Sequence, residues 1–175
     1  YRKNLMIKTK HMNRKIMLLA AICISLYSCS GGFSKGVKKD ISTGLSASYN
    51  GFALEDIYLT DTKETRLSNN KIAMGSPLAV VATGVDHFVE KNGRVYPGCT
   101  IVLTDKAGKE VLNLPDAFAD MKDGYTAAEA KVLQGSLNTG DPMITGETYH
   151  LSVRFFDKNK KESEIVANVD LLMKE

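Results

Sequence analysis

The chain of 175 residues carries 23 Lys and Arg against 20 Asp and Glu, for a formal net charge of +3. Six of the basic residues lie in residues 1–28, where no acidic residue occurs, so residues 29–175 hold 17 basic and 20 acidic side chains. Residues 29–175 therefore lack the excess of positive charge on which nucleic-acid binding depends, and we exclude nucleic acid as a partner. The length predicts a single domain.

The first predicted element is an export signal that begins at Met12. A basic stretch, residues 12–15, precedes an apolar run, residues 16–27, and the small residue Ser28 follows. This order is typical of a secretory signal peptide. The apolar run is shorter than the ~20 residues that cross a bilayer, so it predicts a signal and not a membrane span. Residues 1–11 are expected to lie upstream of the true start.

The segment Leu26-Tyr27-Ser28-Cys29 resembles the lipobox of bacterial lipoproteins, with Leu three residues before the cysteine and a small residue directly before it. Tyr27 departs from the small residue that is commonest at its position. The resemblance implies that a signal peptidase cuts before Cys29 and that this residue carries acyl chains, which anchor the protein in a membrane. Because no acidic residue follows Cys29 directly, it further implies the outer membrane, facing the periplasm, with the cell surface as the alternative.

Residues 29–43 are rich in Gly, Ser and Lys, and we expect them to form a flexible tether between the lipid and a domain of residues 44–175. Two or more acyl chains hold a protein firmly on a bilayer, whereas one holds it reversibly. Cys99 is the only cysteine of the domain, which excludes an intramolecular disulfide and a metal site of paired cysteines.

The domain consists of short runs of alternating apolar and polar residues, which predict half-buried β-strands. The clearest are residues 149–156 and 165–173, joined by a polar turn into a hairpin. A second hairpin is expected around Gly108, between residues 99–104 and 109–114. Further strands are predicted over residues 45–49, 52–59 and 78–85, the last of them central because it is apolar on both faces. The pattern predicts an all-β, two-sheet antiparallel sandwich of seven to eight strands, immunoglobulin-like or transthyretin-like.

The run Met143-Ile144-Thr145-Gly146-Glu147-Thr148-Tyr149 resembles the tyrosine corner of fibronectin type III and related immunoglobulin-like domains. In that family an apolar residue lies six before the tyrosine and a glycine three before it, as here. The resemblance implies that the Tyr149 hydroxyl bonds to the chain just upstream and holds the crossover between the sheets.

One segment favours a helix over a strand. Thr126 and Glu129 have the spacing of a capping box, and residues 127–133 include good helix formers. We therefore expect one short helix or helical turn within residues 126–133.

The sequence offers no catalytic motif, and we predict neither enzymatic activity nor a cofactor. Cys99 lies on the apolar face of its strand, which favours a buried side chain over a nucleophile activated by His87 or His150. A calcium site of the C2 type is an alternative interpretation of the loop aspartates. Turn propensity accounts for the same residues, which are Asp105, Asp116, Asp120, Asp123, Asp141 and Asp157.

The preferred hypothesis is a non-enzymatic binding or assembly module that is held on the membrane by Cys29 and engages another envelope protein. It would use an exposed strand edge or the loops at one end of the sandwich. The main alternative is a module that binds glycans or other surface polymers through Phe88, Tyr96 and Tyr125, which lie in or beside loops. Three aromatics on one exposed face would favour the glycan, and an unpaired strand with apolar flanks would favour the protein.

Overall fold

The computed structural model describes residues 34–61 and 63–175, and within this range Ser34–Glu175 is one structural unit. The predicted signal peptide and the lipobox cysteine, Cys29, lie outside the described residues. Within them, no helix is long and apolar enough to cross a membrane.

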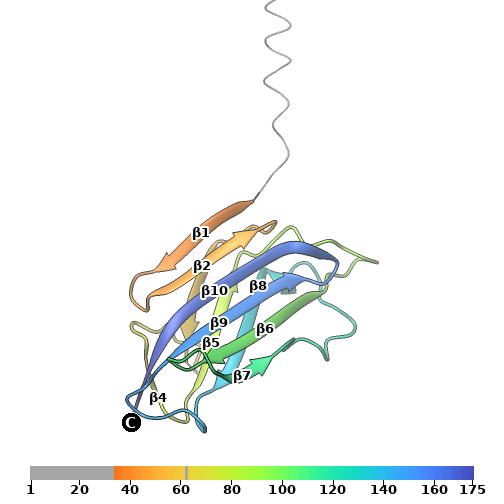
Figure 1. Cartoon of the computed structure of the whole chain (residues 1–175). Helices are drawn as coiled ribbons and strands as arrows, with labels where there is room; N and C mark the ends of the chain where they lie inside the picture. The colour runs from red at the N-terminus through yellow and green to blue at the C-terminus, as the bar shows by residue number, and fades with distance from the viewer. Residues whose placement is uncertain (1–33, 62) are drawn as a thin grey trace, which may run out of the picture. The chain divides into compact units, whose positions relative to one another are not determined.

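Ten strands and one 3-10 turn make up the described part of the chain (Figure 1). In chain order they are β1 (Lys35–Asp40), β2 (Leu45–Asn50), β3 (Asp56–Thr60), β4 (Lys71–Ala73), β5 (Pro77–Thr83), β6 (Pro97–Thr104), β7 (Glu110–Leu114), η1 (Glu129–Lys131), β8 (Val132–Asn138), β9 (Thr148–Asp157) and β10 (Lys160–Lys174).

The strands form two sheets, which confirms the predicted all-β antiparallel sandwich. The larger sheet has seven strands in the order β1-β2-β10-β9-β6-β7, with β4 pairing with the end of β10. The smaller sheet has three strands in the order β3-β5-β8. All pairs are antiparallel except β4 with β10. Ten strands form, which is more than the seven to eight predicted.

The predicted hairpins are present, with β9 paired to β10 and β6 paired to β7. β5 lies in the middle of the smaller sheet, as its two apolar faces predict. Alternation holds in β6, which buries one face: Cys99, Ile101 and Leu103 are all fully buried. They pack in one core with residues of β3, β5 and β8 from the opposite sheet.

The bond implied by the tyrosine corner is also present. The backbone N–H of Ile144 donates to the Tyr149 hydroxyl at 2.9 Å, and Tyr149 is buried. Gly146 has φ +85°, in the left-handed region that favours glycine, so the turn before β9 suits its sequence.

The predicted boundary between tether and domain is wrong. Residues 35–40, which the sequence assigned to the tether, form β1 and pair with β2 along its whole length. The lysines of this segment leave it without the alternation of apolar and polar residues that predicts a strand. Backbone hydrogen bonds between strands form whatever the side chains are. The sandwich therefore begins within the predicted tether, at Lys35.

The short helix or helical turn predicted within residues 126–133 is one 3-10 turn, η1. Its capping box forms, because Thr126 N–H donates to Glu129 Oε2 at 2.7 Å and Glu129 N–H donates to Thr126 Oγ1 at 3.2 Å. The helix does not continue, because Leu133 and the alternate residues after it are buried as the inner face of β8. Like β1, this strand and β4 were not predicted from the sequence.

Candidate functional site

The three predicted aromatic residues lie at the end of the sandwich that carries the β9–β10 turn. Lys158 N–H in that turn donates to the Tyr96 carbonyl at 2.9 Å, and Tyr125 bridges to Val95, the neighbour of Tyr96. Phe88 packs against Phe52 of the core, with ring centroids 4.6 Å apart. All three are half-buried, so only part of each ring is accessible to a ligand.

The one thiol among the described residues, that of Cys99, packs in the hydrophobic core. Cys99 is fully buried, and its Sγ would lie 3.0 Å from a Cβ added at Gly135 of the facing sheet. Burial raises the pKa of this thiol to about 12, and the negative charge of Asp116 adds to the shift. His150 lies on the outer face, where Nδ1 is 2.9 Å from Asp170 Oδ1. His87 is exposed. Neither histidine is placed to activate Cys99.

Three of the loop aspartates, Asp105, Asp116 and Asp157, accept hydrogen bonds from backbone N–H groups. Asp105 accepts the N–H groups of its own turn at the end of the sandwich opposite the β9–β10 turn. Asp157 accepts from Val89 N–H at 2.8 Å. Across the described residues no group of three His, Cys, Asp or Glu side chains is arranged to hold a metal ion. The calcium alternative therefore has no assembled site in that part of the chain.

Asp116 belongs to a half-buried structural contact. Its carboxylate accepts from Cys99 N–H at 3.0 Å and Phe118 N–H at 2.9 Å, and it pairs with Lys158 at 2.7 Å. Burial by itself raises the pKa of Asp116, but these donors outweigh it and hold the pKa below its ordinary value. The carboxylate thus holds the loop after β7 against β6.

The edges of the two sheets differ in how well they are protected from another strand. An exposed edge presents unpaired backbone groups, and natural proteins cover it, shorten it, bend it with a bulge or place lysines on it. β1 carries three lysines, and Lys38 is half-buried on the inner face. β4 has only three residues, and a bulge interrupts the pairing of β7 with β6. These three edges therefore resist strand addition.

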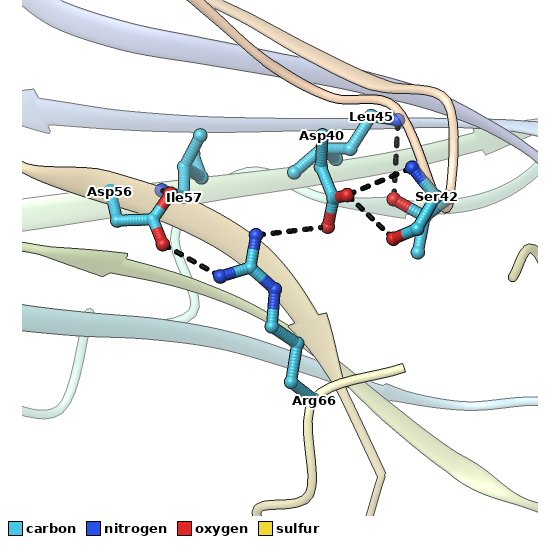
Figure 2. A network of polar contacts seen from close by, with 7 residues as sticks. Asp40, Ser42, Leu45, Asp56, Ile57 and Arg66 are labelled. Atoms are coloured by element: carbon cyan, nitrogen blue, oxygen red, sulfur yellow. Dashed lines mark hydrogen bonds and ion pairs between the residues drawn. The ribbon is translucent and has the colours of Figure 1, made fainter. Parts of the chain in front are cut away.

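The edge at β3 is covered by the segment that follows it. Leu67 N–H donates to the Leu59 carbonyl at 2.9 Å, and Thr60 bridges to Arg66. Figure 2 shows Arg66 between two carboxylates, at 3.2 Å from Asp40 of β1 and 2.8 Å from Asp56 of β3. This ion-pair network joins the two sheets and closes the sandwich along the β1/β3 side.

The network also fixes the charge of its members. Burial raises the pKa of Asp40, but hydrogen bonds from Ser42 and Arg66 outweigh it and hold the pKa below its ordinary value. Burial likewise lowers the pKa of Arg66, but the two carboxylates outweigh it and raise the pKa. The guanidinium also lies over the Tyr58 ring, 4.8 Å from its centroid. Asp40 and Arg66 therefore stay charged at neutral pH.

The opposite side of the sandwich is open along β8. This strand has seven residues, Val-Leu-Gln-Gly-Ser-Leu-Asn, with no charge and no proline. In the described residues it pairs with β5 on one side and with no strand on the other. Unlike β1, β8 carries no lysine, and unlike β4 it is not short.

In the larger sheet, the strand that faces this opening is β7, and it directs apolar side chains toward the opening. Leu112 and Leu114 pair with Leu103 and Ile101 of β6, whose side chains face the core, so they share that inner face. Leu114 is nevertheless 39% exposed. We call the β8 edge together with Leu112 and Leu114 the open edge. The open edge was not predicted from the sequence. Leu133 and Leu137, which lie an even number of residues apart in an uncharged run, could have indicated a strand there.

Comparisons with known proteins give no family for the chain. No family model and no curated protein matches it. Among solved structures, the C-terminal domain of Wzt is 9% identical with a TM-score of 0.46, covering 86% of this chain and 85% of that one. The PmoD soluble domain from Methylocystis sp. (Rockwell) is 8% identical with a TM-score of 0.36, covering 78% and 95%. These likenesses concern the β fold alone.

Proposed function

We propose that this protein is a lipid-anchored, non-enzymatic module of the bacterial envelope that binds another envelope protein at the open edge. The observation that carries the proposal is the unprotected β8 edge lying beside the partly exposed Leu114. Exposed strand edges recognise extended peptides through main-chain hydrogen bonds, and side-chain pockets add specificity.

The choice of a protein partner over a glycan follows from where the candidate groups lie. Phe88 is packed on the core, and Tyr96 and Tyr125 are half-buried, so stacking surfaces for sugars are small. Catalysis would need Cys99, whose thiol is buried and neutral, or another nucleophile beside a base. An uncharged edge with apolar neighbours fits a peptide strand better than it fits either alternative.

The membrane part of the proposal rests on the sequence. The lipobox Leu26-Tyr27-Ser28-Cys29 would supply the anchor at Cys29, and the absence of an acidic residue directly after it supports the outer membrane, facing the periplasm. The sandwich begins at Lys35, which leaves residues 29–34 to join it to the lipid. A tether this short would keep the domain close to the bilayer surface.

Affinity purification of the full-length protein from detergent-solubilised membranes tests the proposed function. We expect a specific envelope protein to co-purify, and Leu114→Glu to reduce its recovery at least tenfold by placing a charge in the open edge. Ile41→Glu is the matched control, because Ile41 is 95% exposed and lies outside that edge. Recovery of the bait alone, or equal losses in both variants, would contradict the proposal.

A further inference from the structure

We infer that the open edge accepts one extended strand from its partner, hydrogen-bonded to β8 and packed beneath β7. This rests on the proposed function and defines the chemistry of the segment: uncharged, with apolar residues at alternate positions. The partner would supply this strand from an extended tail or loop and not from the edge of a folded sheet.

The backbone groups that would bind the strand follow from the register of β8. Thr139 N–H donates to the Ser76 carbonyl at 3.1 Å, and this pair continues the register in which Leu137 faces Leu78. In an antiparallel ladder, successive residues direct their backbone groups to opposite sides. The odd-numbered residues of β8 therefore bond to β5, and the even-numbered ones, including Gln134 and Ser136, direct theirs to the free edge.

The side chains around the opening define the chemistry of the strand. A strand added beside β8 would turn one face toward the core side, where Leu112 and Leu114 of β7 are incompletely covered. Its other face would continue the outer surface of the smaller sheet, where Gln134, Ser136 and Asn138 are exposed. An incoming segment that alternates apolar and polar residues satisfies both faces. A charge on the inner face would be desolvated without an ionic partner.

The position of β7 limits the partner to a single strand. β8 lies against β6 and β9, because a Cβ added at Gly135 would be 3.0 Å from Cys99 Sγ and 2.9 Å from Val153 Cγ1. β7 is the next strand beyond β6, so it extends over the place where an added strand would lie. A second copy paired through its own β8 would bring its β6 and β7 into the layer that β7 already fills. A lone strand meets no such obstacle.

A synthetic peptide tests the binding mode on the full-length protein in detergent. The probe is a nonapeptide of alternating valine and threonine with a lysine at each end, and its control carries N-methyl groups on every valine and threonine, which remove the N–H donors of both hydrogen-bonding edges. We expect the probe to slow hydrogen exchange at the amides of Gln134 and Ser136 at least tenfold, and the control to leave them unchanged. No protection at roughly 1 mM probe, or equal protection by the control, would overturn the inference.

Proline variants separate this inference from the proposed function. Gln134→Pro and Ser136→Pro remove free-edge N–H groups without taking a bond from β5, and proline is tolerated at such edge positions. Val37→Pro is the matched control, because the bond from Gly51 N–H to Ser34 places the Val37 amide on the free edge of β1. We expect the β8 variants to lose both the probe and the co-purified protein, and the control to keep both. If no envelope protein co-purifies with the native chain, the proposed function fails; if one co-purifies equally with the β8 variants, only the strand mode fails.

Discussion

Buried polar side chains in this sandwich fall into satisfied and unsatisfied groups. Thr139 Oγ1 donates toward the Ser76 and Ala73 carbonyls, at 2.8 Å and 3.0 Å. Ser163 is fully buried, and its hydroxyl has no hydrogen-bond partner among the described residues. A buried hydroxyl without a partner keeps its desolvation cost, whereas a bonded one contributes about 1 kcal/mol.

This contrast gives a prediction for two conservative variants. Ser163→Ala should leave the free energy of unfolding unchanged or raise it by up to about 1 kcal/mol, because no bond is lost. Thr139→Val should lower it by about 1 kcal/mol, because the hydroxyl hydrogen bond shared by the Ser76 and Ala73 carbonyls is lost. Urea unfolding of both variants measures the difference, and a larger loss for Ser163→Ala than for Thr139→Val would contradict the assignment.

The pairing of Asp40 with Arg66 predicts a pH dependence of stability. The pKa of Asp40 lies below its ordinary value of 3.8 in the folded state, so the unfolded chain takes up its proton first as pH falls. The contribution of Asp40 is therefore complete above pH 3.8 and is lost as pH falls through the lower, folded pKa. We expect Asp40→Asn to reduce the dependence of the unfolding free energy on pH below pH 3.8. Denaturant titration at several pH values measures this dependence. An unchanged pH dependence would show that the hydrogen bonds from Ser42 and Arg66 do not stabilise the charged carboxylate.

At the scale of the strand, burial of one face made most elements predictable. β6, β9 and β10 could be located from alternation, since each packs one apolar face against the opposite sheet, and β5 could be located from its continuous apolar run. β1 could not, because its lysines carry no apolar signal and its pairing with β2 depends on the backbone. β8 was hidden by the capping box at Thr126, whose local preference for a helical turn is real but ends after η1.

The candidate site was only partly predictable for a related reason. Phe88, Tyr96 and Tyr125 were chosen as loop aromatics, but whether a loop folds over the core depends on contacts between distant residues, such as Phe88 with Phe52. An exposed strand edge was anticipated as a class of site. Assigning it to β8 required the order of strands in the sheet, which no local pattern contains.

An unprotected edge predicts self-association when no partner is present. Gln134→Lys should slow aggregation of the isolated protein, because a lysine on an edge strand opposes the addition of another strand. Ala107→Lys adds the same charge at an exposed turn and should have little effect. Light scattering during incubation near the unfolding temperature measures the rates. Equal slowing by both variants would assign the effect to net charge and not to the β8 edge.

At the scale of the whole molecule, the proposed function depends on a lipid anchor that holds the sandwich at a membrane. Cys29→Ser removes the thiol that the lipobox would present, so the chain should no longer incorporate labelled palmitate or sediment with membranes. Cys99→Ser keeps every feature of the lipobox and should incorporate label normally. Acyl labelling followed by membrane fractionation makes the comparison. Continued labelling and sedimentation of Cys29→Ser would contradict the proposed lipid anchor at Cys29.

In the proposed function, the anchor at Cys29 holds the module at a membrane, where the open edge binds a strand of a neighbouring protein. Photo-crosslinking in intact cells tests this most directly, with a crosslinking amino acid at Gln134 of β8 or, as the reference, at Val37 on the free edge of β1. The account predicts a discrete adduct between this protein and one envelope protein from position 134 and none from position 37. An adduct from position 37 alone, or none from either position, would contradict it.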